Sequence, residues 1–192
     1  MHKAYDIPAH EFRYVLATFV VVPKRWIDAY GKRPFTPGEL TASVNYYRTL
    51  GKHMAIPDIP ETYDEFAELM DSYEAEHFGW EPGARRVADA TMGLMQTFYP
   101  PFAAKPVALF SRAIMDQPLR EALGYDAPPP ALEKASHAAL KARGRMLRLF
   151  PARMSAQTIA DLPWVRSYPD GFDLEQLGTF PTPGVAGCPV AH

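Results

Sequence analysis

Residues 10–30, HEFRYVLATFVVVPKRWIDAY, constrain the fold of this chain more than any other stretch. At helical spacing the apolar residues of this stretch fill several adjoining sides of a helix: Phe12, Val15, Leu16, Phe19, Val20, Val21 and Val22. A helix that is apolar all round belongs in a protein core. The uncharged run at 14–23 is much shorter than the roughly 20 residues that cross a bilayer. The sequence therefore predicts a buried central helix and not a membrane span.

Helix start signals recur along the rest of the chain. Thr36 with Glu39 and Thr62 with Glu65 have the spacing of capping boxes, in which each side chain bonds the other residue's backbone amide. Strand patterns are scarce, so we predict an all-α, multi-helix bundle. The expected helices cover residues 10–30, 37–54, 63–78, 82–98, 102–115, 118–124 and 132–150.

Composition limits the classes of protein to consider. With 192 residues, 47% of them hydrophobic, the chain is long enough for one core, and we predict a single helical domain at 1–178 followed by a flexible tail at 179–192. A net charge of -2 without a basic arm argues against a nucleic-acid partner. Cys188 has no second cysteine to pair with, and no secretory signal is visible, so we expect a cytoplasmic location.

Several segments also resemble a known family. They are His2, YDIPAHEFRYVLATFVVVPKRW, YYRTLGKHMAIPDIPETYDEF and YPDGFDLEQLG, and together they cover nearly the whole chain. They resemble the oxygenase family that includes MpaB and the latex-clearing rubber oxygenases. The resemblance implies a globin-like helical fold that holds haem b. It also implies an enzyme that uses dioxygen to cleave carbon–carbon double bonds in a lipophilic, isoprenoid-like substrate.

The resemblance assigns two site residues. A histidine shortly before the buried helix supplies the axial ligand of the haem iron in this family, and His2 stands in that place. Thr18 matches a hydroxyl residue that lies beside the haem. Each has a simpler explanation: chain termini are commonly disordered, and a helical threonine can donate to the carbonyl one turn earlier. Family members carry further chain before the ligating histidine, so we expect this chain to be a fragment or a shortened homologue.

Two arginines also match the family, Arg48 in YYRTLG and Arg86 in RRVADAT. Structural ion pairs with Asp58, Glu61 or Asp89 explain them equally well, and we do not predict a catalytic role for either.

Other chemistry has weaker signals. Glu74 and His77 form one Glu-x-x-His half-motif, whereas a di-iron site needs two, and no zinc motif of familiar spacing is present. The basic helix at 132–150 is best explained by a solvated face, although its pattern also permits contact with a membrane surface. The alternative to an oxygenase is a non-catalytic helical module that binds a hydrophobic ligand or a partner protein.

Overall fold

The computed structural model describes residues 7–151, 155 and 171. Contacts divide the chain into one unit formed by Ile7–Phe150 and a second formed by Met1–Asp6 with Pro151–His192. All helices of the described residues lie in the first unit. The predicted boundary between a domain at 1–178 and a tail at 179–192 falls outside the described residues and stays a prediction.

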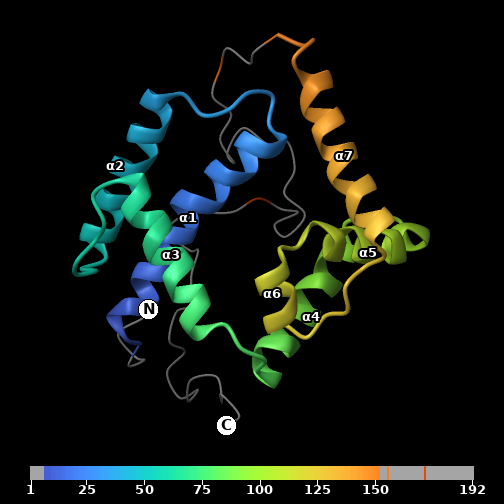
Figure 1. Ribbon diagram of the computed structural model, residues 1–192, viewed down its shortest axis with the longest axis horizontal. Coiled ribbons are helices and arrows are strands. Elements are labelled where there is room, and N and C mark those ends of the chain that lie inside the picture. The colour runs from blue at the N-terminus through green and yellow to red at the C-terminus, as the bar shows by residue number, and fades with distance from the viewer. Residues whose placement is uncertain (1–6, 152–154, 156–170, 172–192) are drawn as a thin grey trace. The chain divides into compact units, whose positions relative to one another are not determined.

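The described residues form seven α-helices and no strand, which confirms the all-α prediction (Figure 1). Each predicted helix is present, with ends that differ from the prediction by a few residues. A short 3₁₀ helix, η2, precedes the fifth α-helix. The elements are α1 (Ala9–Tyr30), α2 (Pro37–His53), α3 (Tyr63–His77), α4 (Pro82–Gln96), η2 (Pro101–Ala103), α5 (Ala104–Ile114), α6 (Gln117–Ala122) and α7 (Pro130–Leu147).

Both predicted capping boxes are formed. The Glu39 amide donates to Thr36 Oγ1 at 3.2 Å, and the Thr36 amide donates back to the Glu39 carboxylate at 2.9 Å. Thr62 and Glu65 make the same reciprocal pair at the start of α3, with distances of 3.3 and 3.2 Å. Each box satisfies two backbone amides that a helix start leaves without an intrahelical acceptor, so local sequence alone sets these two helix starts.

The core lies where α1 packs against α2 and α3. Phe66 of α3 is fully buried there, against Val20 and Val21 of α1 and Val44 of α2. Full burial of a valine or phenylalanine side chain contributes about 1.5–3 kcal/mol. These few side chains therefore hold the first three helices together.

The prediction that the first helix is buried all round is wrong. Only the face of α1 that carries Leu16, Ala17, Val20 and Val21 is buried. On another face Val15, Phe19 and Val22 are 49%, 51% and 47% exposed. The physical reason is that α2 and α3 pack on one side of α1 and cover only that side. None of the helices seen in 7–150 is long and apolar enough to cross a membrane.

Helix α7 crosses the end of α1 at close range. Gly144 is buried there, and a Cβ atom at this position would lie 2.8 Å from the Gly31 carbonyl oxygen and still closer to that of Tyr30. A hydrogen bond of 2.7 Å between the Tyr30 hydroxyl and His137 Nδ1 joins the same two helices.

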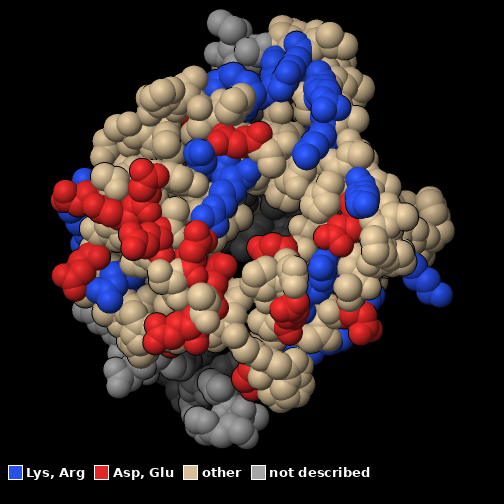
Figure 2. Space-filling model, in the orientation of Figure 1, with Lys and Arg blue, Asp and Glu red and all other residues tan. Residues whose placement is uncertain are grey.

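The basic residues of α7 are exposed, as the solvated-face interpretation predicts. Figure 2 shows Lys and Arg gathered over α7, whereas Asp and Glu gather over α3. The basic side chains of α7 thus face solvent, while Gly144 packs on the end of α1.

We predict that Gly144→Ala lowers the free energy of unfolding by about 1–3 kcal/mol, because the added methyl forces the α1–α7 crossing apart. Gly93→Ala is the matched control, since Gly93 is also helical but has no atom within 4 Å of an added Cβ. This control should gain up to about 1 kcal/mol from better helix propensity. Urea unfolding followed by far-UV circular dichroism measures both. Equal stability of the two variants would contradict the close packing of Gly144 against the end of α1.

Candidate functional site

The structure places one of the two predicted site residues. His2 lies outside the described residues, so its role stays a prediction. Thr18 lies partly buried on α1, and its hydroxyl donates to the Val15 carbonyl at 2.7 Å. This is the bond that a helical threonine makes without any ligand, and it leaves the oxygen able to accept a further hydrogen bond.

Beside Thr18 runs a row of exposed apolar side chains, which we call the outer face of α1. It consists of Val15, Phe19 and Val22, which are spaced four and three residues apart and so share one side of the helix. The Phe19 ring also stacks on Tyr47 of α2, with ring centres 5.7 Å apart. An exposed apolar row of this kind is typical of a surface that binds a ligand or another protein segment.

Of the two family-like arginines, Arg48 makes a structural ion pair and Arg86 lies exposed. Arg48 pairs with Glu61 at 2.9 Å, as one of the ion-pair explanations predicts. Arg86 is exposed, and the arginine that pairs with Asp89 is its neighbour Arg85, at 3.0 Å. Arg85 also donates to the Gly124 carbonyl at 2.7 Å and so ties α4 to the turn after α6.

A partly buried acid–hydroxyl pair joins α1 to α3. The Tyr14 hydroxyl donates to Glu74 Oε1 at 3.2 Å. Burial raises the pKa of the Glu74 carboxyl, the hydrogen bond from Tyr14 offsets part of this rise, and the nearby charges of Asp116 and Asp71 add to it. Burial and the Glu74 charge likewise raise the pKa of Tyr14, so this phenol keeps its proton.

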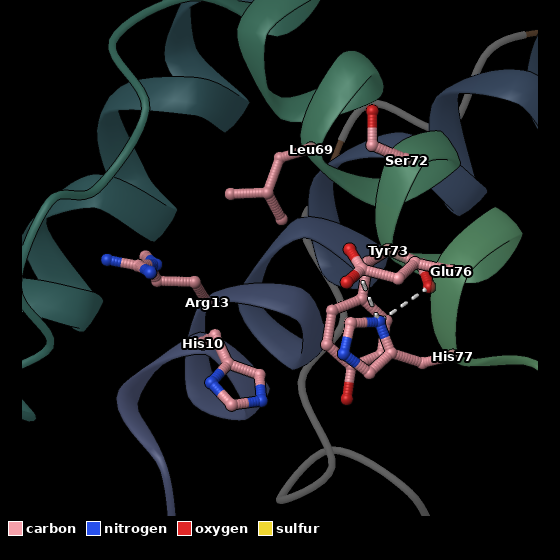
Figure 3. Close-up of a pocket in the computed structure, with 7 residues that line it drawn as sticks. All are labelled: His10, Arg13, Leu69, Ser72, Tyr73, Glu76 and His77. Carbon is pink, nitrogen blue, oxygen red and sulfur yellow. Dashed lines mark hydrogen bonds and ion pairs between the residues drawn. The ribbon is translucent and has the colours of Figure 1, made fainter.

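Next to this pair lies a solvent-open pocket of about 440 Å³, lined by residues of α1 and α3 (Figure 3). His10, Arg13, Tyr73 and His77 are among its lining residues. Glu74 of the half-motif is engaged by Tyr14 and does not line this pocket. No group of three or more His, Cys, Asp or Glu in the described part of the chain is arranged to hold a metal ion.

Comparison with known proteins decides the family. Residues 5–150 match the family described as the catalytic domain of the ER-bound oxygenases mpaB and mpaB' and of rubber oxygenase. The chain belongs to this family. The matched range includes Thr18 and begins after His2.

A curated member of this oxygenase family aligns with most of the chain. The protein named ER-bound oxygenase mpaB' from Penicillium brevicompactum is 28% identical over 185 residues, which cover 85% of this chain and 43% of that protein. The chain thus spans less than half the length of this relative. No solved structure matches.

Sequence reasoning missed the pairing of Tyr14 with Glu74, and it also missed Arg120. The side chain of Arg120 is buried, with its guanidinium 3.4 Å from the Met115 carbonyl and 3.9 Å from the Glu133 carboxylate of α7. Nothing local in the sequence marks either contact, because the partners come from different helices.

We predict that Glu74→Gln becomes more stable relative to the parent chain as pH rises from about 4 to about 7. A carboxyl whose pKa is raised by folding favours the folded state at low pH. That stability is lost as the pH rises from the unfolded-state pKa of 4.5 through the higher folded-state pKa of Glu74. Glutamine keeps an acceptor for the Tyr14 hydroxyl but does not titrate.

Glu76→Gln is the matched control, because Glu76 lies on the same helix and is exposed. Urea unfolding at the two pH values measures the difference between the two variants. If the stability of both variants follows the same pH dependence, burial does not raise the pKa of Glu74.

Proposed function

We propose that this chain forms part of a haem b-dependent oxygenase with a globin-like helical fold. It would cleave carbon–carbon double bonds of a lipophilic, isoprenoid-like substrate with dioxygen. Membership of the oxygenase family supports the general class of reaction. The single structural observation that carries the haem assignment is the exposed apolar outer face of α1.

The residues on this face fit the group. Porphyrin is a flat and largely apolar macrocycle, and Val15, Phe19 and Val22 offer one continuous apolar row about half exposed to solvent. Contact with the macrocycle would remove these side chains from water at a gain of about 25 cal/mol per Å² of apolar surface. The same contact would exclude water from one side of the haem.

Two residues of the chain, His2 and Thr18, would have separate roles at the haem. His2 would ligate the iron through an imidazole nitrogen. The Thr18 hydroxyl, which already donates to the Val15 carbonyl, would offer only its oxygen as an acceptor on this face. When bound, haem would supply the activation of dioxygen. Cleavage of one double bond by one dioxygen molecule gives two carbonyl groups, each of which contains one of the two oxygen atoms.

A second candidate is a non-catalytic module that binds a hydrophobic ligand or a partner protein. It is favoured by exposed apolar side chains outside α1: Val87 of α4 is 68% exposed and Phe102 of η2 is 85% exposed. The same residues would suit contact with a membrane surface. The cytoplasm is the compartment that we propose on the basis of the sequence.

We predict that haemin binding depends on His2 and on the outer face of α1. In a haemin titration followed by Soret absorbance, His2→Ala should remove most of the bound haem, because the iron loses its axial ligand. His53→Ala, His77→Ala and His137→Ala should keep it. Retention of full haem by His2→Ala, with loss in another of these variants, means that the ligand assignment is wrong.

The outer face is tested in the same titration. Val22→Gln should weaken haemin binding about tenfold, because a polar amide is buried against the macrocycle. Val87→Gln is the matched control, as an exposed helical valine on α4, and should bind haemin like the parent chain. If neither the parent chain nor any variant binds haemin, the oxygenase proposal fails for this chain and the binding module replaces it.

A further inference from the structure

Two histidines from different helices meet in the pocket between α1 and α3. His10 lies in the first turn of α1, and His77 is the last residue of α3. Their ring centres are 5.7 Å apart, and the ring planes are tilted by 34°. Both side chains reach solvent, so an ion could enter the pocket from outside.

A hydrogen bond to the backbone orients the imidazole of His77 and favours one tautomer. Its Nδ1 lies 3.2 Å from the Tyr73 carbonyl oxygen, which can only accept a hydrogen bond, so Nδ1 carries the proton. In the neutral imidazole Nε2 then has the lone pair, and Figure 3 shows this second nitrogen on the side of the ring that faces His10. This arrangement, with one nitrogen bonded to a carbonyl and the other free, is the usual state of a histidine that ligates a metal.

Stacking of aromatic rings restricts the His77 imidazole further. Tyr73 stacks on His77 with ring centres 4.2 Å apart and planes within 10°. Tyr73 in turn stacks on Tyr14, also with ring centres 4.2 Å apart. The ligating nitrogen of His77 is therefore positioned before any ion binds, which lowers the entropy cost of binding.

The separation of the two rings suits a shared metal ion. With metal–nitrogen bonds of about 2.0–2.1 Å, two imidazoles on one tetrahedral ion place their ring centres roughly 5–6 Å apart. The observed 5.7 Å lies in this range. Since the described residues provide no third ligand, water would complete the coordination.

The end of α3, which carries His77, favours a cation in the pocket, whereas the start of α1, which carries His10, does not. His77 ends α3, and the C-terminal end of a helix favours positive charge. The Glu76 carboxylate lies 4.0 Å from His77 Nδ1. Arg13 also lines the pocket, but its guanidinium is paired with Asp58 at 3.0 Å, which offsets its charge.

We propose that His10 and His77 bind one divalent transition-metal ion of the class that prefers imidazole, such as Zn²⁺, Cu²⁺ or Ni²⁺. The ion bridges the start of α1 and the end of α3 and stabilises the packing of these two helices. This site shares no residue with the proposed haem site, and its binding of an ion does not require haem.

Calorimetric titration of the whole chain with Zn²⁺ tests the site. His10→Gln and His77→Gln should each weaken binding at least tenfold, and each should abolish the rise in melting temperature that Zn²⁺ gives the parent chain. His53→Gln is the matched control, because His53 is exposed and also ends a helix, α2. It should bind Zn²⁺ and be stabilised like the parent.

A second measurement needs no variant. Electron paramagnetic resonance of the parent chain with one equivalent of Cu²⁺ should show splitting from two imidazole nitrogens. Splitting from a single nitrogen, or Zn²⁺ affinities of His10→Gln and His77→Gln equal to that of the parent, would overturn the proposal.

Discussion

The packing of α1 on α3 is the interaction on which the rest of the described structure depends. Phe66 of α3 is fully buried against the Val20 and Val21 side chains of α1, and α2 closes the same cluster with Val44. The later helices contribute much less burial, since α4 has no buried residue and α5 has only one, Ala113. The first three helices therefore form the best-packed part of the described residues, and they carry all residues proposed for the two sites except His2.

That packing determines where both candidate sites lie. Because α2 and α3 cover one side of α1, the apolar row of Val15, Phe19 and Val22 is left exposed, and it is the face we propose for haem. The α1–α3 contact also brings His10 and His77 together at one end of the pair, although they are far apart in sequence. One helix–helix contact thus supplies the core, a candidate cofactor face and a candidate metal site.

Local signals were predictable from the sequence, and non-local ones were not. The capping boxes at Thr36 and Thr62 set helix starts correctly because both partners lie within one turn. One-sided burial of α1 was not predictable, since a helix that is apolar all round carries no sign of which neighbours are present. The end of α2 was placed only approximately: Ala55 adopts a left-handed φ of 57° there, a conformation that glycine usually signals.

Native-state hydrogen exchange tests most directly the claim that α1 and α3 form the stable part of the chain. Amides buried in a packed core exchange only through large-scale opening, whereas those of exposed helices exchange through local opening. We predict the slowest exchange at Val20 and Val21 of α1 and at Phe66 and Met70 of α3, with clearly faster exchange throughout α4. Slowest exchange in α4, or equal exchange in α1 and α4, would contradict the account.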